Sequence, residues 1–244
     1  MGLIIPIAPK RIAQILVTIV LFLILAHVAV RLIHFIPHDS LVGTEMLINL
    51  FAVNMEANIP TWFSSSTLLI CSGLIATIAL AKKAQDAKYV SHWIALSVIF
   101  LFLSLDEAAG FHEVLGKVML YVFPLSGFLQ SGWVIPGFVF VLMFVLAYLR
   151  FFTHLPLKTR YQFIAAWSLL FLGAIGGEIV GDYFEFIFYG KRNLVVEAIS
   201  TLEELLEMMG VIVFIYGLMS YINSDIKEVR FGSDNGEYSL QLKN

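Results

Sequence analysis

The sequence predicts an all-α polytopic membrane protein, with about six transmembrane helices in one bundle. Hydrophobic residues make up 59% of the 244 residues and charged residues only 14%, whereas a soluble domain has about 25% charged residues. Mean hydropathy is +0.88. In addition, six apolar runs approach or exceed the roughly 20 residues that a helix needs to cross the hydrocarbon core.

The six runs follow one another with short polar connections, at about residues 12–35, 60–81, 92–115, 134–152, 161–189 and 194–222. The first run follows Lys10 and Arg11 as a signal peptide would, but it exceeds the roughly 7–15 residues of a signal core. We therefore expect an uncleaved helix. Pro60 suits the first turn of the second helix. The last two runs are long enough to span with tilt.

Two segments lie outside this pattern. Residues 37–59 are moderately polar, and residues 47–54 within them are predicted to form a short interfacial helix. Residues 1–222 are assigned to the transmembrane bundle. Residues 223–244, rich in Asn, Ser, Asp and Gly, are expected to form a mobile polar tail in the cytoplasm.

The lone Cys71 allows no intrachain disulfide, and the net charge of −3 argues against nucleic-acid binding.

The basic residues predict the orientation, because cytoplasmic loops carry an excess of Lys and Arg. With the N-terminus inside, eleven of the fifteen basic residues fall on the inner side. Six helices then place both ends of the chain in the cytoplasm. We expect a multi-pass protein of a bacterial inner membrane.

Three of the predicted helices carry carboxylates within the hydrocarbon core of the membrane. A charge at the centre of the bilayer costs about 2.5–3.5 kcal/mol, so such residues face one another, water, a proton or a metal. In the predicted orientation all of them fall in the outer halves of their helices. Helical spacing puts them on one face of each helix. The three sets are Asp106 with Glu113, Glu178 with Asp182 and Glu185, and Glu203 with Glu207 and the adjacent Glu204.

Glycines should help to bring these carboxylates together. Gly173, Gly177 and Gly181 form a small-xxx-small row that lets helix backbones approach closely, which would aim the acids of the fifth helix into a pocket. His112 is turned by about 120° from Asp106 on an ideal helix. A joint role for the two needs a helix break, for which Gly110 is the candidate.

The first functional hypothesis is a metal-dependent membrane enzyme acting on a lipid or other hydrophobic substrate. Carboxylates with one or two imidazoles suit iron, manganese or zinc in the core of a helical bundle, and the metal would activate water or oxygen. Glu113 or Glu204 would act as general base. The predicted metal ligands are Asp106, His112, Glu178, Asp182, Glu203 and Glu207, with His34 and His38 as weaker candidates.

Two alternatives stay open. Chains of Asp, Glu and His also mark proton and cation pathways, which would make the protein a proton- or cation-coupled transporter. The inner halves of the helices lack matching polar residues, which favours a one-sided site. A non-catalytic membrane subunit is the third hypothesis.

His27, inside the first helix, is interpreted as a satisfied core histidine, and Glu56 or Asn58 as residues that cover the pocket.

The runs Asn58-Ile-Pro-Thr-Trp-Phe-Ser, Ser104-Leu-Asp-Glu-Ala-Ala and His112-Glu113 together resemble a group of uncharacterised bacterial multi-pass membrane proteins with an SLDEAA-x-x-HE motif. The resemblance implies a multi-pass membrane fold and no particular activity. Membrane hydrolases of the ceramidase type are a looser comparison. Those enzymes hold zinc mainly through histidines, a pattern that this chain lacks, so no residue roles are carried over.

Overall fold

The computed structural model describes residues 8–35, 43–189, 193–226, 229–234 and 237–242. Within these ranges, six helical segments are long and apolar enough to cross a membrane. The prediction of an all-α, multi-pass membrane protein is therefore confirmed. The spans are Pro9–Ile33, Ile59–Ala84, Val90–Ala109, Val134–His154, Leu157–Ile187 and Leu194–Ile226.

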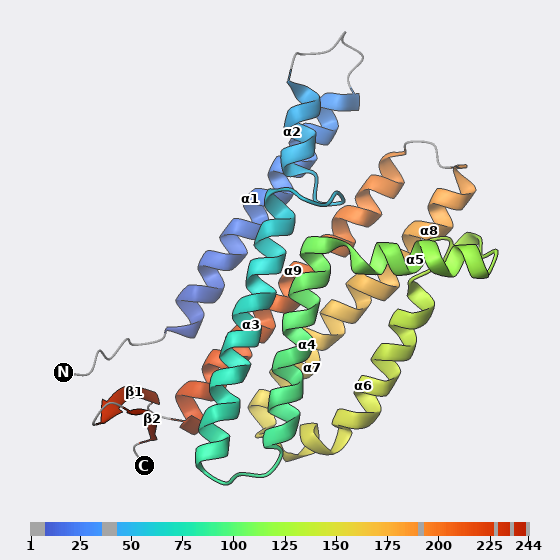
Figure 1. Cartoon of the computed structure of the whole chain (residues 1–244). Coiled ribbons are helices and arrows are strands. Elements are labelled where there is room, and N and C mark those ends of the chain that lie inside the picture. The colour runs from blue at the N-terminus through green and yellow to red at the C-terminus, as the bar shows by residue number, and fades with distance from the viewer. Residues whose placement is uncertain (1–7, 36–42, 190–192, 227–228, 235–236, 243–244) are drawn as a thin grey trace.

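The elements follow in the order shown in Figure 1. The first half of the chain forms α1 (Pro9–Phe35), α2 (Thr44–Phe51), α3 (Ile59–Ala84), α4 (Val90–Ala109), α5 (Phe111–Val122) and the short 3₁₀ helix η1 (Gly127–Leu129). The second half forms α6 (Val134–His154), α7 (Leu157–Phe171), the π-helix η2 (Leu172–Gly177), α8 (Glu178–Ile187), α9 (Leu194–Tyr221), the π-helix η3 (Ile222–Ile226), β1 (Val229–Asp234) and β2 (Glu237–Leu242).

The third span is shorter than the sequence predicted. It ends at Ala109, because Gly110 adopts the left-handed conformation with φ +62°. This conformation is unfavourable for residues that carry a Cβ atom. The chain restarts as α5, which runs across the end of the bundle instead of along it (Figure 1). The short helix predicted between the first two spans is present as α2.

The segment beyond the last span contains β1 and β2, which pair antiparallel from Val229 opposite Leu242 to Asp234 opposite Glu237. This hairpin falls within residues 223–244, which were expected to form a mobile polar tail. It lies at the same end of the bundle as the start of α1 (Figure 1).

Hydrogen bonds between serines join α3 and α4. Ser65 Oγ donates to the Ser104 carbonyl oxygen at 2.8 Å, and Ser104 Oγ donates back to the Ser65 carbonyl oxygen at 2.8 Å. Seven residues further along α3, Ser72 and Ser97 make the same reciprocal pair at 2.8 and 3.0 Å. Small polar residues of this kind let membrane helices approach closely and bond across the interface.

Aromatic side chains fill the half of the bundle away from α5. Phe100 of α4 stacks on Phe214 of α9 with ring centroids 4.8 Å apart, and Phe163 of α7 lies 4.7 Å from the same ring. Trp93 lies in the next layer of this core, where its ring centroid is 5.4 Å from that of Tyr221. The opposite half, where α4 ends and α9 begins, holds the acidic residues.

Candidate active site

The break at Gly110 brings Asp106 and His112 together. Asp106 Oδ1 accepts a hydrogen bond from the backbone N–H of His112 at 2.7 Å, and Asp106 Oδ2 lies 3.1 Å from His112 Nδ1. Trp133 contacts the imidazole edge-on, with ring centroids 5.4 Å apart. The break inferred from helical spacing is thus present, and it fixes the orientation of the imidazole.

Glycines of the fifth span set the distance between α8 and α9. An added Cβ on Gly177 would lie 2.7 Å from Glu203 Cβ, and one on Gly173 would lie 2.7 Å from Glu207 Cγ. Both glycines belong to the π-helix Leu172–Gly177, a rare wide turn that often marks a functional site. The predicted glycine row therefore packs on α9, directly against the acidic residues.

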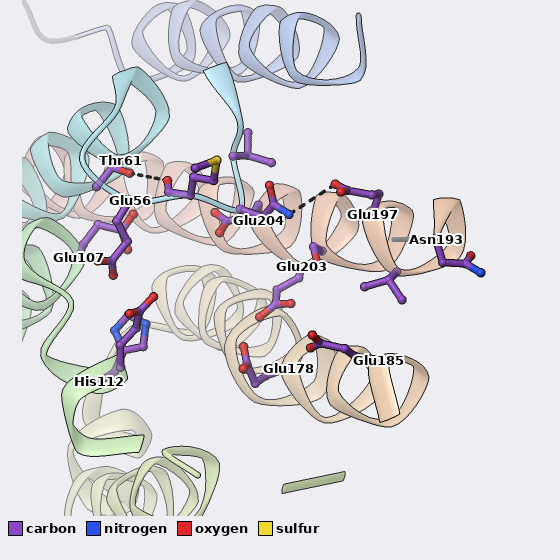
Figure 2. A pocket seen from close by; sticks show the side chains of 16 residues that line it. Glu56, Thr61, Glu107, His112, Glu178, Glu185, Asn193, Glu197, Glu203 and Glu204 are labelled. Atoms are coloured by element: carbon purple, nitrogen blue, oxygen red, sulfur yellow. Dashed lines mark hydrogen bonds between the residues drawn. The ribbon is translucent and has the colours of Figure 1, made fainter. Parts of the chain in front are cut away.

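A polar pocket of about 470 Å³ opens beside these contacts. Figure 2 shows its acidic side chains facing a common space from several elements, with His112 on the opposite side from α9. Among the described lining residues there is no Lys or Arg. The carboxylates that line it are Glu56, Glu107, Glu113, Glu178, Glu185, Glu197, Glu203 and Glu204.

Two of these carboxyl groups meet across α8 and α9. The carboxyl groups of Glu178 and Glu203 approach within hydrogen-bonding reach, and Figure 2 shows them turned toward one another. A carboxylate has only acceptor atoms, so a hydrogen bond between two carboxyl groups needs a proton on one of them. The pair can therefore hold a proton, or a cation placed between its oxygens.

Other acids of the pocket have partners nearer the rim. Arg31 of α1 forms a salt bridge with Glu197 at 3.1 Å, and Lys117 forms one with Glu113 at 3.1 Å. Glu185 accepts a hydrogen bond from Gln130 at 3.0 Å. The sequence did not reveal the role of Arg31, because it comes from the first helix. Within the described ranges, no salt bridge is formed by Glu56, Glu107, Glu178, Glu203, Glu204 or Glu207.

A second, more apolar cavity of about 240 Å³ adjoins the polar pocket. Its walls come from α3, α4, α6, α7 and α9, and they include Leu68, Phe140, Phe171 and Trp167. Trp167 is only 6% exposed, and its indole N–H has no hydrogen-bond partner in the described part of the chain. The residues shared by the two cavities are Glu107, His112, Glu178, Glu203 and Glu204.

The loop between α2 and α3 covers one side of the pocket. The Glu56 carboxylate lies over Gly110, with Oε2 2.5 Å from the position of an added Cβ. Asn58 is buried beneath the loop instead. Its side-chain amide donates to the carbonyl oxygens of Ala52 and Met55 at 2.6 and 2.8 Å, and its oxygen caps α3 by accepting from Thr61 N–H at 3.0 Å.

His27 fastens the same loop to the bundle. The backbone N–H of Val53 donates to His27 Nδ1 at 3.2 Å, so the proton of a neutral imidazole sits on Nε2. Nε2 then donates to Thr201 Oγ at 3.0 Å, and that hydroxyl donates to the Glu197 carbonyl oxygen at 2.6 Å. The interpretation of His27 as a satisfied core histidine is confirmed.

The pocket shifts the pKa of two groups that lie outside the spans. Burial alone would lower the pKa of His112, but the hydrogen bond to Asp106 and the charges of Asp106, Glu56 and Glu107 outweigh it and raise the pKa to about 9. For Glu56, burial and the charges of Glu113 and Asp106 raise the pKa. His112 is therefore a cation at neutral pH.

The predicted site residues do not all gather in one place. His112, Glu113, Glu178, Glu203 and Glu204 line the polar pocket, with Glu113 at its rim. Asp106 and Glu207 line the apolar cavity. These seven side chains therefore surround a continuous space.

Asp182 has a different place in the structure. It is 6% exposed and accepts hydrogen bonds from Ser131 N–H and Oγ, at 2.9 and 2.8 Å. It thereby ties α8 to the segment that leads into α6, and it lines neither of the two cavities.

The described His, Cys, Asp and Glu side chains form no group of three that could hold a metal ion. The metal centre expected from the sequence therefore has no support from these residues. The side chain of His34 and residue His38 lie outside the described ranges.

Glu107 belongs to the site but was absent from the predicted ligand set. A signal for it existed in the spacing, since Trp93, Phe100 and Glu107 repeat every seven residues. The first two are fully buried core residues, and a repeat of seven keeps one face of a helix.

The fold and the site define a multi-pass helical membrane protein with an acidic pocket at one end of its bundle. Residues 15–222 match the family described as a domain of unknown function, DUF8692, and the chain belongs to that family. No curated protein and no solved structure matches the chain.

Proposed function

We propose that the protein is a membrane enzyme that acts on the polar end of a lipid or other hydrophobic substrate. The observation that carries the proposal is the boundary between the two cavities. There, four glutamates and His112 line both a polar pocket and an apolar cavity. A hydrophobic molecule in the cavity would present its polar end to these acid–base groups.

His112 is the proposed general acid. Its raised pKa keeps it protonated at neutral pH, and Asp106 fixes the ring through Nδ1, which leaves Nε2 as the proton donor. Glu107 and Glu204 are the proposed proton acceptors, since both line the two cavities. Acid–base catalysis of this kind requires a donor and an acceptor within reach of one substrate group.

A one-sided site supports an enzyme more than a conduit. The half of the bundle beyond the apolar cavity is packed with stacked aromatic rings, including Phe100, Phe163 and Phe214. Lys and Arg placement supports an inner-membrane orientation with both ends of the chain in the cytoplasm. The substrate would enter from the lipid or from the side of the membrane on which the pocket opens.

The test is mass spectrometry of molecules extracted from purified protein. Wild type is expected to carry a hydrophobic molecule that Ala174→Phe loses, because Ala174 lines the cavity. Ala95→Phe is the matched control, since Ala95 is exposed on the outer face of α4. His112→Gln should retain a bound molecule of different mass, the unreacted substrate. The same occupancy in wild type and Ala174→Phe would refute the proposal.

A further inference from the structure

The charge of the polar pocket restricts what can bind there. Six acids of the two cavities have no salt bridge among the described residues, and five of these line the polar pocket itself. An anionic head group such as a phosphate or a carboxylate would face eight acidic side chains, with His112 as the only cation among the described lining residues, and contact between like charges costs several kcal/mol. The ligand that suits this pocket carries a positive charge.

The size of the pocket distinguishes between cations. A bare metal ion needs several ligand atoms at about 2.0–2.6 Å, and the described side chains form no such group of three. The carboxylates instead surround about 470 Å³, a volume in the range of sites for small organic molecules. A protonated amine on an organic molecule fits this arrangement better than a bare ion.

The adjoining cavity supplies the second half of the recognition. Away from the acidic residues its lining is largely apolar and includes Trp167, which is almost fully buried and whose indole N–H has no partner among the described residues. A buried donor left unpaired is unfavourable, so a ligand atom that accepts its hydrogen bond would be stabilising. Trp167 precedes Glu178 by eleven residues, which is roughly 16 Å along a helix.

Resting on the proposed function, we propose that the substrate is an amphiphilic amine. Its ammonium group lies among Glu178, Glu203 and Glu204, and its apolar body extends into the cavity toward Trp167. The carboxylates accept hydrogen bonds from the ammonium group, as charge-assisted contacts that are stronger than those between neutral groups. Phosphate-bearing lipids and fatty acids are disfavoured by the same charges.

The test compares three twelve-carbon probes: dodecylamine, dodecanol and dodecanoate. Binding to purified protein in a neutral detergent is followed by tryptophan fluorescence, because Trp133 and Trp167 line the cavity. The variant is Glu203→Gln with Glu204→Gln. The control, Glu45→Gln with Asp86→Asn, removes the same charge at positions outside both cavities. Each probe partitions into the detergent micelles to the same extent whichever protein is present. For a given probe, the ratio of the Kd values of two proteins is therefore independent of this partitioning.

We expect dodecylamine to bind wild type and the control alike, and to bind the double variant about tenfold more weakly or worse, since two carboxyl groups that can pair with the ammonium as carboxylates are replaced by neutral amides. Dodecanol should be insensitive to the double variant, and dodecanoate should bind it better than wild type. An equal change of Kd for amine and alcohol between wild type and the double variant, or an amine Kd within about twofold in the double variant, would overturn the inference.

Three further outcomes test this inference and the proposed function separately. Probe binding that is blocked by Ala174→Phe but insensitive to head-group charge would keep the cavity and reject the amine. Near-stoichiometric iron, manganese or zinc by elemental mass spectrometry, lost in Glu203→Gln with Glu204→Gln, would replace the amine by a metal ion. Probe binding unaffected by Ala174→Phe would reject the cavity itself, and the proposed function with it.

Discussion

Gly177 lies directly beneath Glu203, whose Cβ is 2.7 Å from where a Cβ on the glycine would stand. The backbone of the fifth span can therefore approach α9 only because that position has no side chain. This close approach places Glu203 beside Glu178, which follows Gly177 in the chain. Helix packing and the arrangement of the carboxylates thus depend on one residue.

We expect Gly177→Ala to lower the free energy of unfolding by about 1–3 kcal/mol, the usual cost of overpacking. The new methyl group would meet the stem of Glu203 at Cβ, Cγ and Cδ, so the glutamate cannot escape by rotating only its tip. Thermal unfolding in detergent measures the change. Gly176→Ala is the matched control, because its added Cβ has no neighbour nearer than 4.0 Å. Equal stability of the two variants would contradict the packing.

The reciprocal serine bonds between α3 and α4 should be energetically coupled. In a double-mutant cycle, Ser65→Ala and Ser104→Ala are expected to show a coupling free energy of about 0.6 kcal/mol, as is typical of hydrogen bonds between membrane helices. Each hydroxyl donates to the other residue's backbone carbonyl oxygen, and the two hydroxyl oxygens lie 3.2 Å apart, so the coupling reports the direct contact between the hydroxyls. Strictly additive effects on stability would show that the two bonds form independently.

The Asp106–His112 pair should make stability depend on pH. The pKa of His112 is raised to about 9 in the folded protein, against about 6.5 when unfolded. A raised pKa favours the folded state fully below about pH 6.5, and this contribution is lost as pH rises through 9. Thermal stability in detergent should therefore fall between pH 6.5 and 9, and less so in Asp106→Asn.

A direct measurement of His112 provides the control for this pH dependence. Nuclear magnetic resonance of labelled histidine should give a pKa well above 6.5 in wild type, and a lower one in Asp106→Asn, which keeps the shape of the side chain without its charge. A His112 resonance that titrates near 6.5 in both proteins would mean that the pair does not share a proton as the geometry indicates.

Much of the fold follows from hydropathy and from single residues with strong local effects. The six spans were predicted from apolar runs, and Gly110 was identified as the candidate for a break in the third. The glycine row of the fifth span predicted its close packing on a neighbour. Such features are local, because each depends on the backbone preferences or size of one residue.

The partners of the carboxylates could not be predicted in the same way. Arg31 pairs with Glu197 across 166 positions of sequence, and Asp182 accepts a hydrogen bond from Ser131, which lies in the segment before α6. Helical periodicity gives the face on which each acid lies, but not the rotation of one helix relative to the next. The sequence therefore indicated which residues are acidic at this depth, without distinguishing those that line the pocket from those already paired.

Trp167 gives the sharpest prediction about the apolar cavity. Trp167→Phe keeps an aromatic ring against Phe214 and Phe144 but removes the unpartnered indole N–H. If a ligand accepts that hydrogen bond, its occupancy should fall by about two- to tenfold, since a neutral hydrogen bond contributes about 0.5–1.5 kcal/mol. Trp93→Phe is the control, because Trp93 is a buried core residue outside the cavity. Mass spectrometry of the extracted ligand measures both. Equal loss in the two variants would indicate a general effect on packing, and unchanged occupancy in Trp167→Phe would show that the indole does not bind the ligand.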